Sequence, residues 1–142
     1  MKKTIFIIFS IVFLFSCNGD KKNNCITSAA AIAGSYKVTA VTYKASATSP
    51  EINYFDQLYP DACEKDDIIT FSANNTYVFS DAGVACVPSG NDNGTWSLSG
   101  TTSIVIDGYT AELESFDCKK LVFINPNTQT AGDRLKLTLT RQ

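Results

Sequence analysis

The chain has 142 residues without a single histidine, and its first sixteen residues have the layout of an export signal. Removal of that signal would leave about 126 residues, enough for one domain with a substantial core. Because Lys2 and Lys3 would leave with the signal, the mature chain would carry ten basic and fourteen acidic residues, a net charge of −4. A mildly acidic chain without a basic stripe is unsuited to nucleic-acid binding. The lack of histidine excludes histidine-based triads, metal sites and pH switches.

The signal at residues 1–16 has a positive start and a short apolar core. Lys2 and Lys3 precede an apolar run of eleven residues from Ile5 to Phe15, which only Ser10 interrupts. A helix of that length, at about 1.5 Å per residue, cannot cross a hydrocarbon layer of about 30 Å. A cleaved signal peptide is therefore favoured over a membrane-spanning helix.

The apolar run ends in Leu14-Phe15-Ser16-Cys17, which resembles the lipobox of bacterial lipoproteins: an aliphatic residue, two further positions ending in a small residue, then cysteine. The resemblance implies that Cys17 becomes the lipidated first residue of the mature chain and anchors it in a membrane. The alternative is an ordinary secretory signal that contains a cysteine. Asn18 replaces the aspartate that marks inner-membrane retention. We therefore expect an outer-membrane lipoprotein of the cell envelope, facing either the periplasm or the cell surface.

Residues 17–33 and 34–142 differ in composition. The first segment is polar and then rich in small residues, without a period of 2 or 3.6, and we expect it to be a lipidated N-terminus and flexible tether. The second is expected to be one domain, in which short β-rich runs alternate with Gly, Asn, Asp and Pro. The expected strands are Ser35–Lys44, Asp67–Ser72, Thr76–Ser80, Thr95–Ser99, Ser103–Ile106, Tyr109–Ser115, Leu121–Asn125 and Arg134–Arg141. The long connection between the first two carries one expected helical turn, Tyr54–Tyr59.

The order and spacing of these strands predict the fold class. In the last strand Leu135, Leu137 and Leu139 share one face, with polar residues on the other, as expected for a half-buried strand. A Greek-key sandwich needs several long return connections, whereas this chain has only one. An all-β, eight-stranded antiparallel up-and-down barrel is therefore favoured over a sandwich.

The hairpin around Ala73-Asn74-Asn75 can be assigned a register from its hydrophobic pattern. A three-residue loop pairs Phe71 with Tyr77 and Ile69 with Phe79, which gathers four large apolar residues on one face. A two-residue loop would mix apolar and polar residues on both faces. The three-residue loop is therefore expected, with Asn75 in the left-handed region.

Four cysteines remain once Cys17 is assigned to lipid, and an exported, oxidising setting favours two disulfides. If the first strand of the meander runs up, Cys25 and Cys118 fall at the bottom of the barrel, whereas Cys63 and Cys86 fall at the top. The Cα atoms of a disulfide lie about 5.5 Å apart, too close to span a barrel. Only the pairing Cys25–Cys118 with Cys63–Cys86 meets this limit.

Extending the hairpin register places Cys63 opposite Ala85, one residue short of Cys86. We therefore expect a bulge at Gly83 that closes the gap. Zinc binding by the four cysteines is the alternative, but the chain has no C-x-x-C spacing.

Several stretches between Ile32 and Arg141 carry a family resemblance. Ile32-Ala33-Gly34-Ser35-Tyr36-Lys37-Val38 resembles the opening Gly-x-Trp strand of lipocalins, with Tyr36 in place of the tryptophan. The other matching stretches are Cys63–Phe71, Asn75–Tyr77, Cys86, Gly94–Trp96 and Leu135–Leu139. Together they resemble the small lipocalin-like domains of bacterial lipoproteins. The resemblance implies an eight-stranded barrel and suggests binding of an apolar ligand.

Aromatic side chains on inward faces are the first candidate ligand-binding residues. An eight-stranded barrel is either filled by side chains or holds one small ligand. Two roles are therefore open for these residues, as plain core or as the lining of a cavity: Phe71, Tyr77, Phe79, Trp96 and Tyr109.

A second candidate group lies in the long connection, near the expected mouth of the barrel. Tyr54, Phe55, Leu58 and Tyr59 would form either a movable lid over a ligand or a permanent plug, since exposed large apolar groups in one loop are a liability. The tether would enter at the opposite end, so that a ligand would enter from the solvent side.

Charged residues suggest three further interpretations. The acidic run of Asp56, Asp61, Glu64, Asp66 and Asp67 lacks the alternating ligands of an EF-hand loop, so a solvated acidic rim is favoured over a calcium site. Asp92-Asn93-Gly94 is expected to be a turn. Arg141 would either lie across Tyr36 in a cation–π contact, as the corresponding lipocalin residue does on its tryptophan, or remain a solvated terminal charge.

The sequence therefore predicts a monomeric, membrane-anchored barrel that binds a small apolar or amphipathic ligand, without nucleic acid, metal or cofactor. It carries no Gly-x-Ser-x-Gly, phosphate loop or Cys–His pair, so an enzyme is not expected. The alternative is a surface or periplasmic interaction module with a filled barrel. An open apolar cavity of at least about 300 Å³ would favour ligand binding, and a filled barrel with an exposed apolar patch would favour the module.

Overall fold

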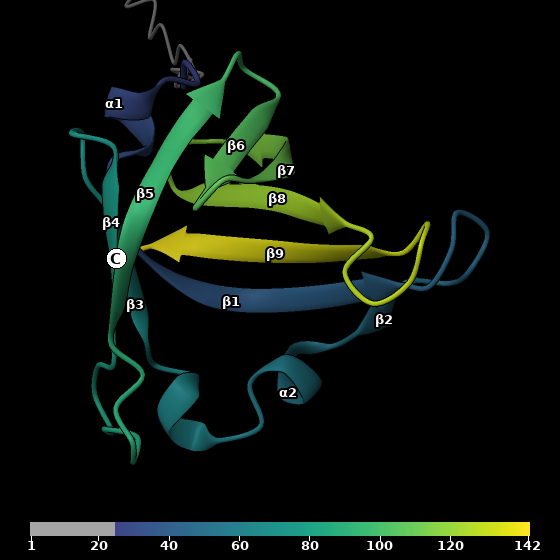
Figure 1. Cartoon of the computed structure of the whole chain (residues 1–142), viewed down its shortest axis with the longest axis horizontal. Helices are drawn as coiled ribbons and strands as arrows, with labels where there is room; N and C mark the ends of the chain where they lie inside the picture. Colours follow the sequence, from purple (N-terminus) through teal and green to yellow (C-terminus); the bar gives the residue numbers. More distant parts are fainter. Residues whose placement is uncertain (1–24) are drawn as a thin grey trace, which may run out of the picture.

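The computed structural model describes residues 25–142, whose strands form a closed β-barrel (Figure 1). The strand order is β2-β1-β3-β4-β5-β6-β7-β8-β9, and all neighbours are antiparallel. Because β1 also pairs with β9, eight strands close the barrel, and the short β2 pairs only with the end of β1. The expected eight-stranded up-and-down barrel is confirmed.

The strands are β1 (Gly34–Lys44), β2 (Ile52–Asn53), β3 (Ile68–Phe71), β4 (Thr76–Ser80), β5 (Asp92–Ser99), β6 (Ser103–Ile106), β7 (Tyr109–Phe116), β8 (Lys120–Pro126) and β9 (Arg134–Arg141). The helices are α1 (Ala29–Ile32), α2 (Phe55–Leu58) and the 3-10 helix η1 (Ala62–Glu64). The helical turn expected at Tyr54–Tyr59 is confirmed as α2. Within residues 25–142, no helix is both long and apolar enough to cross a membrane.

The β3–β4 hairpin has the register that its hydrophobic pattern predicts. Phe71 pairs with Tyr77 and Ile69 with Phe79, and Asn75 has a φ of 68°. The expected turn at Asp92-Asn93-Gly94, in contrast, is wrong. These residues begin β5, with Asp92 opposite Phe79, because ladder hydrogen bonds to β4 outweigh their local turn preference.

The end of the barrel at which β1 begins is closed by α1. Ile32 is fully buried in the core, and the disulfide Cys25–Cys118 fixes the preceding segment to the turn between β7 and β8. Residues 25–33, which we expected to lie in a tether, therefore belong to the folded domain. Cys17, the expected signal and the rest of the expected tether lie outside the described residues.

Arg141, at the end of β9, completes this closure. Its guanidinium lies 5.0 Å from the centre of the Tyr36 ring, and it donates to the Tyr36 hydroxyl at 2.6 Å. It also donates to the carbonyl oxygens of Ala31 and Ala33, at 2.5 and 3.2 Å. The expected cation–π contact is confirmed. Because a side chain at Gly34 would lie 2.7 Å from the guanidinium, the glycine is what lets the arginine reach these carbonyls.

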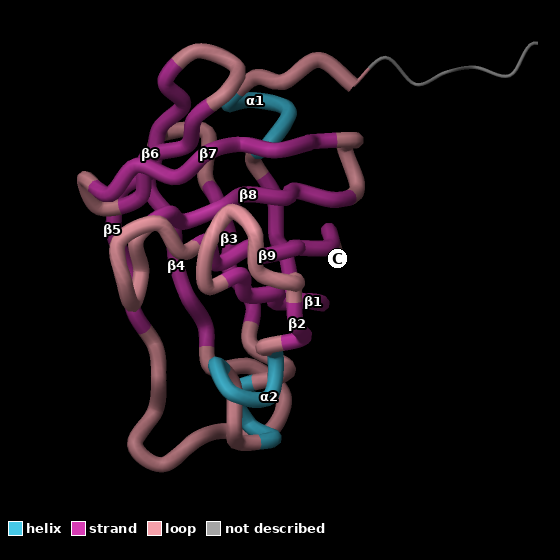
Figure 2. The backbone as a smooth tube through the Cα atoms, turned by 90° about the vertical axis from the view of Figure 1, so that its right-hand side faces the viewer, coloured by secondary structure: helices cyan, strands magenta, loops and turns pink. Residues whose placement is uncertain are grey.

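The connection after β1 and the loop after β4 lie at the opposite end from α1 (Figure 2). The disulfide Cys63–Cys86 joins η1 to that loop, so both predicted disulfide pairings are confirmed. The β3–β4 ladder ends at Ile68 opposite Ser80, so the bridge joins two loops and the expected bulge at Gly83 is wrong. Gly83 instead has a φ of 63° and lies against the Asp66 carboxylate, where a Cβ would overlap it.

Candidate ligand-binding cavity

Three aromatic side chains fill the closed half of the barrel. Phe71 contacts Tyr36 and Trp96, with ring centres 5.9 and 5.1 Å apart, and all three are at most 2% exposed. The indole of Trp96 donates to the Ser72 carbonyl oxygen at 3.0 Å, which satisfies its one polar group. This cluster forms the floor of the barrel interior.

A chamber of about 580 Å³ opens between β6, β7, β8 and β9. Its apolar wall consists of inward-facing residues from each of these strands: Ile106, Ala111, Phe123 and Leu137. They face one cavity because side chains alternate between the two faces of a strand. Tyr109, which is 80% exposed, and the segment 125–128 form its rim.

A second chamber of about 360 Å³ lies between β3, β4 and β5, and it shares Ile106 and Phe123 with the first. Phe71, Tyr77 and Phe79, which the sequence singles out, all line it. Trp96 instead packs into the floor. Both chambers reach the size of ordinary small-molecule pockets, about 300–1,000 Å³. The barrel is thus filled at its closed end and hollow toward its mouth.

Asp107 places a carboxylate on the wall of the larger chamber. It begins the tight Asp107-Gly108 turn between β6 and β7, in which both residues have positive φ. It accepts hydrogen bonds from the Tyr77 hydroxyl at 2.5 Å and the Thr95 N–H at 2.8 Å. A Cβ at Gly94 would overlap the carboxylate, so that glycine makes room for it.

These contacts shift the pKa of both partners. The hydrogen bond from Tyr77, followed by that from the Thr95 N–H, lowers the pKa of Asp107, so the carboxylate is charged at neutral pH. The same hydrogen bond, with burial and the charges of Asp107 and Asp92, raises the pKa of Tyr77 to about 12. The pair therefore presents a neutral phenol and a negative carboxylate.

The rim segment between β8 and β9 is organised by Asp133, which is 1% exposed. Its carboxylate accepts the N–H groups of Thr128, Gln129 and Thr130 at 2.7–2.8 Å and the Tyr43 hydroxyl at 3.1 Å. Burial alone would raise the pKa of Asp133, but the three N–H groups outweigh it and lower the pKa to about 2.

The aromatic residues expected to form a lid lie beside the chambers rather than among the residues that line them. Tyr54 packs on Tyr43 with ring centres 5.2 Å apart, and its hydroxyl accepts from the Gln129 side chain at 2.8 Å. Phe55 and Tyr59 contact each other and the core, with ring centres 5.5 Å apart. Leu58 is 36% exposed. The segment therefore joins the β8–β9 loop to the barrel end.

The acidic run near η1 is only partly solvated. Asp67 is 7% exposed and accepts the Ala82 N–H at 3.2 Å. Burial, together with the charges of Asp81, Asp66 and Glu64, raises its pKa. Within residues 25–142, no three side chains of the metal-binding kinds gather into a site.

Sequence reasoning missed several residues of the larger chamber: Ile106, Asp107, Asn125, Asn127 and Thr128. The Asp-Gly pair and the Asn-Pro-Asn segment do mark turns in the sequence. What no local signal gives is that these two turns border the same cavity, because that depends on the curvature and stagger of the whole barrel.

Comparison with known proteins agrees with this architecture. The sequence model of a lipocalin-like domain matches residues 32–128, which is well over half of the chain. No curated protein matches the chain significantly. The chain belongs to the lipocalin-like domain family.

Proposed function

We propose that this protein is a membrane-anchored lipoprotein whose barrel binds a small apolar or amphipathic molecule in the two adjoining chambers. The observation that carries the proposal is the apolar chamber of about 580 Å³ at the barrel mouth. A filled barrel would offer no such volume, so the cavity favours ligand binding over the interaction-module alternative. The lipocalin-like family is generally non-enzymatic, and we propose binding rather than catalysis.

The anchoring part rests on the lipobox-like Leu14-Phe15-Ser16-Cys17 and on where the domain begins. Cys25 is bonded to Cys118 at the closed end, opposite the chambers. A lipid on Cys17 would therefore hold the closed end toward the outer membrane and leave the mouth free.

Cell fractionation tests the anchor. We expect Cys17→Ser to move the protein from the membrane to the soluble fraction, and mass spectrometry of the wild type to find acyl chains on the N-terminal peptide. Asn23→Ser serves as the control, since it introduces the same residue into this segment without touching the lipobox or the Cys25–Cys118 disulfide. A Cys17→Ser protein that stays in the membrane, together with an unmodified wild type, would contradict the anchor.

Binding is tested with the neutral fluorescent probe N-phenyl-1-naphthylamine on the soluble domain. Ala111→Phe should fill the larger chamber and abolish the fluorescence increase, while Val122→Phe, which adds similar bulk at a position between two inward-facing residues of β8, should leave it intact. Tyr109→Ala gives a second test that does not risk the fold, because that side chain is 80% exposed. It should weaken binding. Equal binding by all four proteins, or none by the wild type, would contradict the proposal.

A further inference from the structure

The two chambers carry charge of one sign. Among the residues that line them, two are acidic, Asp107 in the larger chamber and Asp92 in the smaller. Within the described part of the chain, no lysine or arginine lines either one. An apolar cavity with carboxylates and no cation is a poor site for a fatty acid, because a buried carboxylate head needs a donor or an opposite charge.

Asp107 is held in a position from which it can meet a ligand. Tyr77 and the Thr95 N–H each bind one carboxylate oxygen, which orients the group while each oxygen keeps a second lone pair. The side chain is exposed at the chamber wall. Asp92 lines the smaller chamber together with Tyr77, and its charge contributes to the raised pKa of Tyr77. Asp107 and Asp92 therefore place one carboxylate on the wall of each of the two adjoining chambers.

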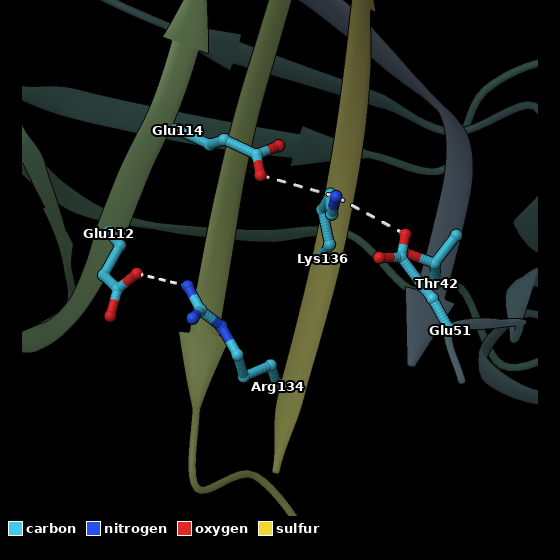
Figure 3. A network of polar contacts seen from close by, with 6 residues as sticks. All are labelled: Thr42, Glu51, Glu112, Glu114, Arg134 and Lys136. Carbon is cyan, nitrogen blue, oxygen red and sulfur yellow. Dashed lines mark hydrogen bonds and ion pairs between the residues drawn. The ribbon is translucent and has the colours of Figure 1, made fainter. Parts of the chain in front are cut away.

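Two cations near this end, Arg134 and Lys136, have acidic partners (Figure 3). On the outer face of β9, Arg134 pairs with Glu112 at 2.6 Å. Lys136 lies 3.4 Å from both Glu51 and Glu114. These pairs offset the positive charges locally, so they do little to neutralise the field at the mouth.

Lys65 is likewise paired, with Asp56 at 2.8 Å. Beyond the smaller chamber, Glu64, Asp66 and Asp81 lie close enough to Asp67 for their charges to raise its pKa. Carboxylates thus predominate among the charged residues around Asp67, next to the smaller chamber. Like charges that line a cleft add up to a field that selects ligands by sign.

We propose that the chambers select an amphiphile with a protonated amine head, its apolar part against Ile106, Phe123 and Leu137 and its ammonium group beside Asp107 and Asp92. This inference rests on the proposed binding function and names its ligand class. Neutral amphiphiles should bind less tightly, and anionic ones least tightly.

Three amphiphiles of equal chain length separate the contribution of the head group to binding from that of the apolar chain. Decylamine, decanol and decanoate are each used below their micelle concentrations to displace N-phenyl-1-naphthylamine from the soluble domain at pH 7. We expect decylamine to bind about threefold to fivefold more tightly than decanol, and decanol to exceed decanoate by a similar factor, as suits partly exposed charge pairs. Raising the salt from about 20 mM to about 0.5 M should nearly remove both differences.

Charge-neutralising variants test whether the preference for decylamine comes from the carboxylates of the chambers. Asp107→Asn and Asp92→Asn should each reduce the preference for decylamine, and the double variant should bind the amine and the alcohol equally. Glu112→Gln on the outer face removes the same charge and should leave the preference unchanged. Binding of the neutral probe should persist in all of them, which shows that they are folded.

The outcomes distinguish a failure of the binding function from a failure of the charge selection. If neither the probe nor any decyl compound binds, the binding function itself is wrong. If the probe and decanol bind but decylamine is not preferred, the charge selection is wrong while the binding function stands. A preference that survives in the double variant, or disappears in Glu112→Gln, would also overturn the assignment to Asp107 and Asp92.

Discussion

Among the single residues, two carboxylates set the shape of the mouth, the buried Asp133 and the exposed Asp107. Asp133 gathers three consecutive N–H groups of the β8–β9 loop and the Tyr43 hydroxyl, and Asp107 joins the β6–β7 turn to β4 and β5. A buried carboxylate is tolerated only where such donors surround it. The β6–β7 turn and the β8–β9 loop are thus each held by hydrogen bonds to a carboxylate.

Because of Asp133, we expect the stability of the fold to change with pH in the acid range. The pKa of Asp133 in the folded protein is about 2, below its ordinary value. The stabilisation that the ionised Asp133 carboxylate supplies is therefore complete above about pH 4 and is lost as the pH falls toward 2. We expect Asp133→Asn to lower the free energy of unfolding at pH 7 and the difference from the wild type to shrink toward pH 2, as measured by urea denaturation. A difference that does not depend on pH would contradict this role.

Gly94 should control the pKa of Tyr77. Gly94→Ala would push the Asp107 carboxylate aside, break its bond to Tyr77 and move the Tyr77 pKa from about 12 back toward its ordinary value of about 10. NMR of ¹³Cζ-labelled tyrosine follows this titration. Gly90→Ala is the matched control, because a Cβ there meets only the Phe79 ring at 3.8 Å. An unchanged Tyr77 titration in Gly94→Ala would show that Asp107 is not the cause.

The raised pKa of Tyr77 also has a consequence at high pH. A group that holds its proton more tightly in the folded state stabilises the fold fully below its unfolded pKa, here about 10, and this stabilisation is lost as the pH rises through about 12. Tyr77→Phe should therefore flatten the loss of stability above pH 10. If the wild type and Tyr77→Phe lose stability in the same way above pH 10, the Tyr77–Asp107 hydrogen bond is not coupled to folding.

At the scale of elements, the two ends of β9 differ in what their arginines do. Arg141 bonds two carbonyl oxygens of the α1 segment and the Tyr36 hydroxyl, whereas Arg134 makes one exposed pair with Glu112. We expect Arg141→Ala to cost about 2–4 kcal/mol of unfolding free energy, because several charge-assisted bonds are lost and buried acceptors are left unpaired. Arg134→Ala, the control on the same strand, should cost about 1 kcal/mol or less. Equal effects in thermal and urea unfolding would contradict the closing role of Arg141.

The segment 54–59 should behave as a fixed plug. Tyr54 is held by Tyr43 and Gln129, and neither Phe55 nor Tyr59 lines a chamber. We expect its amide hydrogen exchange to be the same with and without N-phenyl-1-naphthylamine. Exchange that is fast in the empty protein and slows on binding would instead identify the segment as a lid.

Elements that depend on a local sequence pattern could be predicted from the sequence, whereas elements that depend on distant contacts could not. Alternation in Leu135, Leu137 and Leu139 predicts β9, and the face argument predicts the β3–β4 register, because both depend on neighbours along the chain. The start of β5 at Asp92 and the burial of Asp67 were not predictable in this way. They depend on partners in β4 and in the loop after it.

At the scale of the whole molecule, two disulfides fix the two ends of the barrel. Cys25–Cys118 closes a loop over a sequence separation of 93 residues and Cys63–Cys86 one over 23. The direction of the strands in an up-and-down barrel predicts this pairing, so topology, which the sequence does reveal, was enough. The lining of the cavity, in contrast to the disulfide pairing, could be predicted only in part. It comes from strands whose approach depends on barrel stagger. The sequence indicates Phe71, Tyr77, Phe79 and Tyr109 but not Phe123, Asp107 or the 125–128 rim.

Methyl NMR of the soluble domain titrated with decylamine shows whether a small amphiphile occupies the interior near the mouth. We expect the methyl signals of Ile106, Ala111 and Leu137, which line the larger chamber, to shift in one saturable step. The methyl signals of Ile124 and Val105, which lie outside both chambers, should not move. Shifts confined to these outer methyl groups, or no saturable shift at all, would contradict binding in the interior.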